Sequence, residues 1–134
     1  MTSMTDLINA AIEARLRAYA PYSGYLVGAA ILDTHGDVWT GCNVEFVSYG
    51  LCVCAERTAL CKMVSEGVRG FSAVAIATRD GGTPCGMCLQ SFMEFAVDPH
   101  ETKVATVSES GTQNQFKLSD LIPHGFNSFD IRRT

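Results

Sequence analysis

Apolar residues recur at helical spacing near the start of the chain, within residues 5–19. The apolar positions on one face of this segment are Leu7, Ile8, Ala11, Ile12 and Leu16. The pattern predicts an amphipathic helix with Ser3 or Thr5 as its N-cap. Pro21 ends the predicted helix, because proline lacks the backbone N–H that a helix interior requires.

Runs of small and branched apolar residues predict the strands. Residues 25–32 form a mostly apolar run, and turn residues at 33–36 lead into a returning run at 38–40. This arrangement predicts a hairpin. Further strands are expected at 71–77 (the sequence FSAVAIA, a central strand), 103–107 and 115–118.

Two further helices are expected between these strands. One begins after a loop at 43–53, covers about 54–66 and ends near Gly67, and the other covers about 85–95 after a turn. Strands that alternate with helices indicate an α/β layered fold with at least part of the sheet parallel. A chain of 134 residues is the size of one compact domain, so we expect a single domain over 1–134.

The composition of the chain limits the kinds of molecule that we expect the protein to bind. The formal net charge is −4, and no basic stripe is available to follow a phosphate backbone, so we expect no nucleic-acid partner. No apolar run approaches the roughly 18–20 residues that span a bilayer, so no membrane partner is expected. The N-terminal stretch lacks the basic start and apolar block of a secretory signal, which predicts a cytoplasmic location with reduced or metal-bound cysteines.

The strongest chemical motif is a set of three cysteines. Cys54 stands at the start of the second predicted helix, and Cys85 and Cys88 form a Cys-x-x-Cys pair at the start of the third. Helix N-termini carry partial positive charge, which favours thiolates over thiols. Three thiolates can hold one tetrahedral zinc ion per chain and leave its fourth position open for water, as a catalytic site requires.

Two residues beside Cys54 fit this chemistry. Glu56 is close enough to face water at the metal without binding the ion, so its carboxylate can move protons as the catalytic group. Three thiolates on Zn²⁺ give an excess negative charge of about one unit. Arg57 can offset that charge by donating hydrogen bonds to the sulfur atoms.

Two alternatives fit the cysteines less well. A Cys-x-x-Cys pair in a cytosolic protein can be a redox pair. A closed structural zinc site is also possible, with Cys52 as the fourth ligand. Cys42 and Cys61 are expected to be small core residues.

Four motifs in order resemble the small, homotetrameric, zinc-dependent type of the cytidine deaminase family. They are PYSGYLVGAA from Pro21, GCNVE from Gly41, CAER from Cys54 and PCGMCLQ from Pro84, and the similarity continues to LIPHGF at the end, which closes with Phe126. The resemblance implies a three-layer α/β/α sandwich with a mixed five-stranded sheet. It also implies hydrolysis of cytidine or deoxycytidine, with inter-subunit active sites in a homotetramer.

The same resemblance assigns the substrate contacts. Asn43 and Glu45 match residues that hold a ribose hydroxyl, and the backbone N–H of Ala55 matches a group that helps to bind the pyrimidine. Tyr25 takes the place of a phenylalanine beside the base. Tyr49 and Phe126 would reach a neighbouring subunit's pocket, although plain core packing is the alternative for Tyr25 and Phe126.

Three departures from the family pattern leave the substrate open. Phe46-Val47 follow Glu45 where Asn-Ala is common, Leu89 replaces an arginine, and the loop before Pro84 is about two residues shorter. Phe46 lies on the loop that is expected to line the sugar side of the pocket. These changes leave a modified cytosine nucleoside or a blasticidin-type antibiotic as an alternative substrate. A catalytically silent zinc-binding relative has no need of Glu56, and the acidic charge disfavours nucleic-acid editing.

Overall fold

The structure is a computed structural model, and it describes residues 1–126. The helices in this part of the chain are α1 (Met4–Arg15), α2 (Ala55–Ser65), α3 (Gly86–Phe95), the short α4 (Leu118–Leu121) and a single 3-10 turn, η1 (Tyr49–Leu51). The strands are β1 (Gly28–Asp33), β2 (Val38–Cys42), β3 (Phe71–Ala77), β4 (Lys103–Val107) and β5 (Gln113–Lys117). The prediction of one domain over 1–134 stays a prediction, since residues 127–134 lie outside the described residues.

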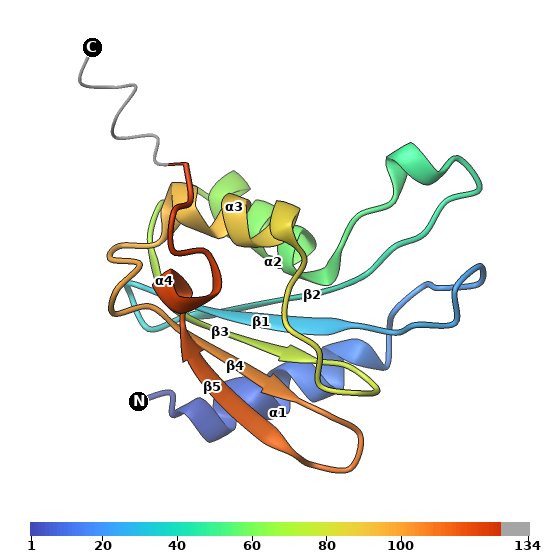
Figure 1. Cartoon of the computed structure of the whole chain (residues 1–134), viewed down its shortest axis with the longest axis horizontal. Helices are drawn as coiled ribbons and strands as arrows, with labels where there is room; N and C mark the ends of the chain where they lie inside the picture. The colour runs from blue at the N-terminus through green and yellow to red at the C-terminus, as the bar shows by residue number, and fades with distance from the viewer. Residues whose placement is uncertain (127–134) are drawn as a thin grey trace.

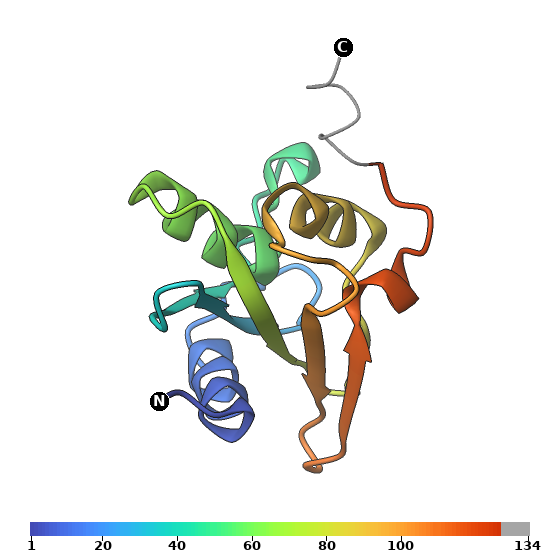
Figure 2. The same cartoon turned by 90° about the vertical axis from the view of Figure 1, so that its left-hand side faces the viewer.

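The strands form one mixed sheet in the order β2-β1-β3-β4-β5. Neighbouring strands are antiparallel except β3 and β4, which pair in parallel because α3 connects them across one face of the sheet. Helix α1 covers one face of the sheet, whereas α2 and α3 cover the other (Figures 1 and 2). The expected three-layer α/β/α sandwich and the hairpin of β1 and β2 are therefore confirmed.

Strand β3 separates two different halves of the core. Val74 and Ile76 pack on the side of α2 and α3, where Phe71 at the start of the strand also lies. Ala73, Ala75 and Ala77 alternate with Val74 and Ile76 and lie on the α1 side. This face carries small side chains, so α1 can lie close to the sheet. At Gly28 in β1, an added Cβ would stand only 2.1 Å from the carbonyl oxygen of Ala11 in α1.

Helix α1 is shorter than the sequence predicted. Ser3 is its N-cap, with a capping box to Asp6, so Thr5 is not the cap. The helix ends at Arg15, because Leu16, Arg17 and Ala18 form successive i→i−3 hydrogen bonds that tighten the last turn. Two of the predicted face residues are exposed: Leu16 (77%), which lies beyond the end of the helix, and Ile12 (43%), which lies within it.

Helix α2 also rests directly on the sheet. An added Cβ on Gly41 in β2 would stand 2.5 Å from the backbone nitrogen of Ala59 and 2.7 Å from the carbonyl oxygen of Ala55. Real Cβ atoms essentially never make such short contacts with backbone, so only glycine fits between β2 and α2. This contact fixes the height of α2 above the sheet.

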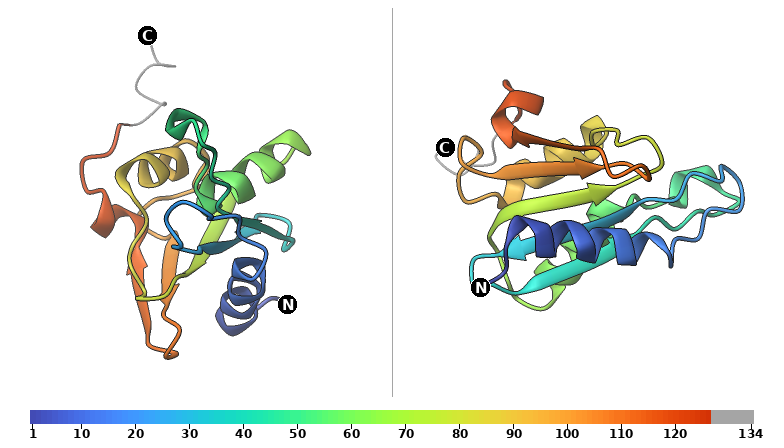
Figure 3. Two further views of the ribbon diagram at one scale, coloured as in Figure 1. Left: turned by 90° about the vertical axis from the view of Figure 1, so that its right-hand side faces the viewer. Right: turned by 90° about the horizontal axis from the view of Figure 1, so that it is seen from below.

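Two segments extend together beyond the end of the sheet (Figures 1 and 3). We call residues 16–27 the outer loop and residues 43–53 the outer arm. The backbone of Tyr19 in the loop bonds to Asn43 and Glu45 in the arm, and Val44 pairs with Val53 within the arm. Residues 25–27 belong to the outer loop and not to a strand, because β1 begins at Gly28.

The remaining predictions of secondary structure agree with the observed elements within one or two residues, and β5 lies at Gln113–Lys117. Among the described residues, no helix is both long enough and apolar enough to cross a membrane.

Candidate metal centre and substrate cavity

Three sulfur atoms meet where α2 and α3 begin. Cys54 is the N-cap residue of α2, Cys85 is the N-cap residue of α3, and Cys88 lies in the first turn of α3. Neither cap makes a side-chain capping hydrogen bond, so both thiols are free to face another partner. The three Sγ atoms lie within 4.8 Å of one another.

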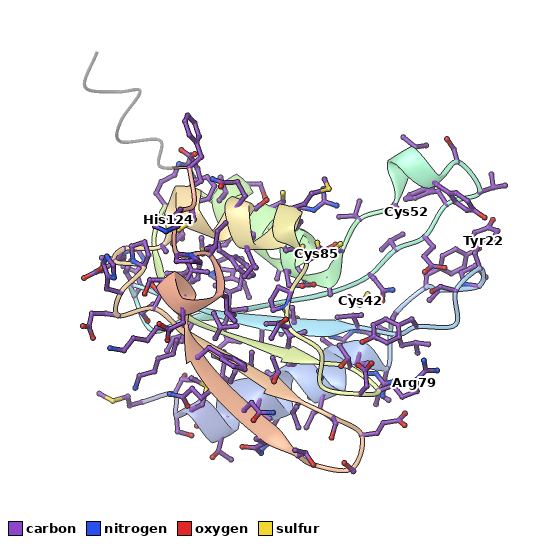
Figure 4. All side chains as sticks on the ribbon, in the orientation of Figure 1. Tyr22, Cys42, Cys52, Arg79, Cys85 and His124 are labelled. Carbon is purple, nitrogen blue, oxygen red and sulfur yellow. The ribbon has the colours of Figure 1, made fainter. Side chains whose placement is uncertain are left out.

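This cluster fits one zinc ion. Zn–S bonds of about 2.3 Å in a tetrahedron hold sulfur atoms roughly 3.8 Å apart, within the observed limit. Cys52 does not belong to the cluster, and its Sγ contacts the backbone N–H and carbonyl of Phe46. In Figure 4, Cys52 lies on the outer arm, away from Cys85. The closed four-cysteine alternative therefore has no support in the geometry.

The thiols interact strongly with one another and with Arg57. Hydrogen bonds, chiefly from Cys88 and then from Arg57, outweigh the effect of burial and lower the pKa of Cys54 to about 5. The same contact with Cys54, together with burial, raises the pKa of Cys88. Three sulfur atoms this close together can bind a divalent cation, which replaces thiol protons on binding.

Glu56 lies in the first turn of α2, directly after the cap residue Cys54 and Ala55, and is only 5% exposed. Burial is the main reason that the pKa of Glu56 is raised to about 7, and the charge on Cys54 raises it as well. A carboxyl group with a pKa near neutrality can both accept and donate a proton, which suits an acid–base role.

Arg57 follows Glu56 and reaches the sulfur cluster from the side. Its Nη2 lies 3.9 Å from the Sγ of Cys54, and this contact raises the pKa of Arg57. Its Nε is buried without a hydrogen-bond partner among the described residues. The predicted contact between Arg57 and a sulfur ligand is therefore present.

A cavity of about 380 Å³ opens beside the cluster. Four residues that the resemblance assigned to substrate binding line it together with Glu56, and they are Tyr25, Asn43, Glu45 and Ala55. Cys54 and Cys85 form the inner end of the cavity, and Val27, Ile76 and Val53 add apolar walls. A volume of this size suits a small molecule, and the lining combines apolar walls with few polar groups, as such sites usually do.

Asn43 and Glu45 also hold the outer loop in place. The Asn43 side chain accepts from the N–H of Val27 at 2.9 Å and donates to the carbonyl of Tyr25 at 2.8 Å. Glu45 accepts from the backbone N–H groups of Tyr22 and Ser23 and from the Ser23 hydroxyl. The hydrogen bonds from Ser23 are the main reason that the pKa of Glu45 is lowered, so the carboxylate is ionised. Each side chain keeps part of its hydrogen-bonding capacity for a ligand.

Tyr49 and Phe126 do not line this cavity. Tyr49 lies in η1 and borders a smaller cavity of about 340 Å³, next to the first one on the outer side of Glu45. Phe126 is 62% exposed, and its backbone exchanges two hydrogen bonds with the Gln90 side chain on α3. Core packing is thus excluded for Phe126 within the described residues.

Two departures from the family pattern lie outside the cavity. Phe46 is 41% exposed and is not one of its lining residues, although other residues of the same loop, Asn43, Glu45, Cys52 and Val53, do line the cavity. The backbone bonds to Cys52 orient this part of the arm. Leu89 is 8% exposed and belongs to the core between α3 and the sheet, so this leucine is a packing residue.

Sequence reasoning missed three polar residues at the cavity. Ser23 bonds to Glu45, while Thr78 and Asp80 organise the loop after β3 that contributes Gly82 and Thr83 to the wall. The Asp-Gly-Gly sequence at 80–82 gave a turn signal, but nothing local indicated that a tyrosine 55 residues away bonds to Asp80.

Comparison with known proteins agrees with this geometry. The family model described as the cytidine and deoxycytidylate deaminase zinc-binding region matches residues 1–103. A cytidine deaminase of Halalkalibacterium halodurans is 44% identical over 127 residues, covering 93% of this chain and 95% of that protein. One from Sporosarcina psychrophila is 39% identical, covering 93% of this chain and 92% of that protein.

Solved structures show the same fold. The crystal structure of cytidine deaminase from Burkholderia pseudomallei has a TM-score of 0.87 at 41% identity, and the match covers 93% of this chain and 100% of that one. The cytidine deaminase structure from Mycobacterium tuberculosis gives 0.78 at 35% identity, with 95% and 99% covered. The chain therefore belongs to the cytidine and deoxycytidylate deaminase family.

Proposed function

We propose that this protein catalyses the zinc-dependent hydrolysis of cytidine and 2′-deoxycytidine to uridine and 2′-deoxyuridine, with release of ammonia. The observation that carries the proposal is the pairing of the three-sulfur cluster with the buried carboxyl of Glu56 at the inner end of one cavity. A structural zinc site has no use for an acid–base group of this kind.

The roles of the inner residues follow from their positions. Cys54, Cys85 and Cys88 would hold the zinc ion, and zinc at this site would supply Lewis acidity for the attack of water on the base. Glu56 would take one proton from the attacking water and pass it to the ring nitrogen. It would then move the proton left on the added hydroxyl to the departing amine, which leaves as ammonia. Arg57 donates a hydrogen bond to Cys54 and compensates the charge of three thiolates.

The outer residues bind the nucleoside. Asn43 and Glu45 line the cavity and offer an amide and a carboxylate to a sugar hydroxyl, while the Ala55 N–H and the Tyr25 ring face the base. The cavity lining contains no lysine or arginine among the described residues, whereas it contains Glu45 and Glu56. This charge favours a neutral nucleoside over a phosphorylated nucleotide such as deoxycytidylate.

The decisive experiment is a substrate panel with the purified zinc-loaded protein. Loss of the amino chromophore should be followed in the ultraviolet for cytidine, 2′-deoxycytidine, deoxycytidylate, adenosine and a cytosine nucleoside antibiotic. We expect turnover of the first two and at least tenfold lower kcat/KM for deoxycytidylate. Turnover of the antibiotic alone would reassign the enzyme to modified cytosine nucleosides.

We also propose a homotetramer in which Tyr49 and Phe126 reach a neighbouring subunit's cavity. The arm exposes several apolar side chains in a row, and a partner subunit would bury them: Phe46, Val47, Tyr49 and Leu51. Sedimentation equilibrium should give four times the mass of one 14.4 kDa chain. An active monomer would disprove the assembly.

None of the six cysteines is in a disulfide, which supports the expected cytoplasmic location.

A further inference from the structure

The hydroxyl of Tyr25 connects two walls of the cavity that come from distant parts of the sequence. It donates a hydrogen bond of 2.6 Å to Oδ1 of Asp80, in the loop that follows β3. Tyr25 lies in the outer loop, and its ring lines the cavity together with Thr78 and Gly82. Figure 4 shows Arg79 at the turn of the loop after β3, below Cys85.

The loop on the Asp80 side is organised around the same oxygen. Oδ1 of Asp80 also accepts from the N–H of Gly82 and from the hydroxyl of Thr78, both at 3.2 Å. The Thr78 hydroxyl in turn accepts from the N–H groups of Gly81 and Gly82. Gly81 has φ of +77°, a left-handed backbone that suits glycine. The loop is therefore a tight turn whose position depends on where Asp80 is held.

The wall on the other side depends on the backbone of Tyr25. The Tyr25 carbonyl accepts from Asn43 at 2.8 Å, and its N–H donates to the Ser23 hydroxyl at 3.0 Å. That hydroxyl bonds to Glu45. A continuous series of hydrogen bonds thus runs from Asn43 and Glu45, through Tyr25, to Asp80.

The charge states of the pair support the hydrogen bond. Burial, followed by the bond to Asp80, raises the pKa of Tyr25, so the phenol keeps its proton and acts as donor. The bond from Tyr25 is the main reason that the pKa of Asp80 is lowered, so the acceptor is a carboxylate. The guanidinium of Arg79 lies 5.5 Å from the centre of the Tyr25 ring, which adds a cation–π contact.

We propose that the Tyr25 hydroxyl and Asp80 form a positioning pair that sets the width of the substrate cavity and thereby determines specificity at the base. The inference rests on the proposed deamination of cytidine. An added Cβ on Gly82 would stand 3.6 Å from the Tyr25 oxygen, an ordinary van der Waals contact, so the gap between the two walls at this point is about one methyl group wide. While the pair holds, the cavity takes cytosine nucleosides without an added ring substituent and disfavours larger bases.

The test is Tyr25→Phe, which removes one oxygen and keeps the ring. We expect KM for cytidine to rise about three- to tenfold, because a single hydrogen bond is lost, with a smaller change in kcat. The kcat/KM ratio of 5-methylcytidine to cytidine should rise by a similar factor. Tyr19→Phe is the matched control, since it removes a hydroxyl from an exposed tyrosine outside the cavity lining.

Variants of Asp80 separate a pairwise contact from a general loss of structure. Asp80→Ala should reproduce the effect of Tyr25→Phe, and the double variant should be no worse than either single variant. Asp80→Asn should restore most of the binding, because an amide oxygen still accepts from the phenol. Fully additive effects in the double variant, or an unchanged KM and base preference in Tyr25→Phe, would overturn the proposal.

A measurement without substrate keeps this inference separate from the proposed function. Hydrogen–deuterium exchange of the peptide covering residues 78–84 should be several times faster in Tyr25→Phe than in the native protein and in Tyr19→Phe. If the native protein fails to deaminate cytidine or deoxycytidine, the proposed function is wrong. The exchange result still shows whether the Tyr25 hydroxyl holds the loop of Asp80 in place. Equal exchange in all three proteins would disprove the Tyr25–Asp80 connection.

Discussion

The inner and outer ends of the cavity are built in different ways. The inner end consists of residues at the starts of α2 and α3, and these helices pack on the sheet through buried residues such as Leu60, Met63 and Phe92. The outer end consists of the outer loop and the outer arm, which hold each other by backbone bridges and by the side chains of Asn43 and Glu45. Exposed apolar residues, among them Tyr49 and Leu51, mark the outer end.

Because of this difference, we expect the inner end of the cavity to determine the type of reaction and the outer end to determine the choice of substrate. A rigid core fixes the atoms that carry out chemistry, because packed helices have little freedom to move. Loops held by hydrogen bonds can change sequence and shape without disturbing that core. We therefore expect substitutions at the inner end to abolish turnover and substitutions at the outer end to shift KM or preference.

The largest effect is expected from Cys88→Ser. Cys88 is fully buried in the sulfur cluster, so its loss should reduce zinc from one ion per chain to near zero and abolish turnover. Cys52→Ser is the matched control and should keep one zinc ion, because Cys52 contacts the Phe46 backbone and not the cluster. Metal analysis by mass spectrometry decides both. Loss of zinc from the control would revive the four-cysteine site.

Glu56→Gln should come second. The amide fills the same space and cannot move protons, so kcat should fall by about 10²–10⁴ while the zinc content stays at one per chain. Glu66→Gln removes an exposed carboxylate at the other end of α2 and should leave kcat unchanged. Steady-state kinetics with cytidine supply the measurement. A kcat within threefold of the native value would remove Glu56 from the mechanism.

Arg57→Ala should have an intermediate effect. Loss of the contact at 3.9 Å to Cys54 should weaken zinc binding about tenfold, because groups that support metal ligands typically contribute to affinity on this scale. Competition with a zinc chelator measures the change. Arg17→Ala, which removes an exposed cation beyond α1, provides the comparison and should bind zinc as the native protein does. Equal affinities in the two variants would contradict the charge-compensation argument.

The smallest effect is expected from Phe46→Asn. The side chain does not line the cavity, so the relative kcat/KM for cytidine and deoxycytidine should change by less than about twofold. Val47→Asn, at the next exposed apolar position of the arm, serves as the reference for any effect on assembly. A change of preference above fivefold in Phe46→Asn alone would show that the Phe46 side chain reaches the substrate.

The sequence predicted the inner end of the cavity well, because the residues that form it lie close together in the sequence. Cys54 and Glu56 lie two residues apart at a helix start, and Cys85 and Cys88 lie three apart at another, so spacing alone defines their faces. The sheet and the main helices follow from apolar runs for the same reason. The early end of α1 had no comparable signal, since Leu16 continues the apolar pattern and is nevertheless exposed.

The outer end depends on contacts between distant residues, which no local pattern reveals. The direction of Phe46 is set by bonds between its backbone and Cys52, and the buried position of Leu89 is set by packing against the sheet. The bond between Tyr25 and Asp80 crosses 55 residues of sequence. The substitution of a tyrosine was visible in the sequence, but its partner was not.

Gly41 makes the metal-binding end of the cavity harder to alter by mutation than the end formed by the loops. At Gly41, the backbone of α2 lies directly against the backbone of β2. No side chain stands between them that could be replaced by a slightly larger or smaller one. The metal-binding end therefore cannot be shifted in small mutational steps, and a library that varies Gly41 should return almost only glycine among active clones. New substrate preferences in this scaffold must accumulate in the loops that face the catalytic helix.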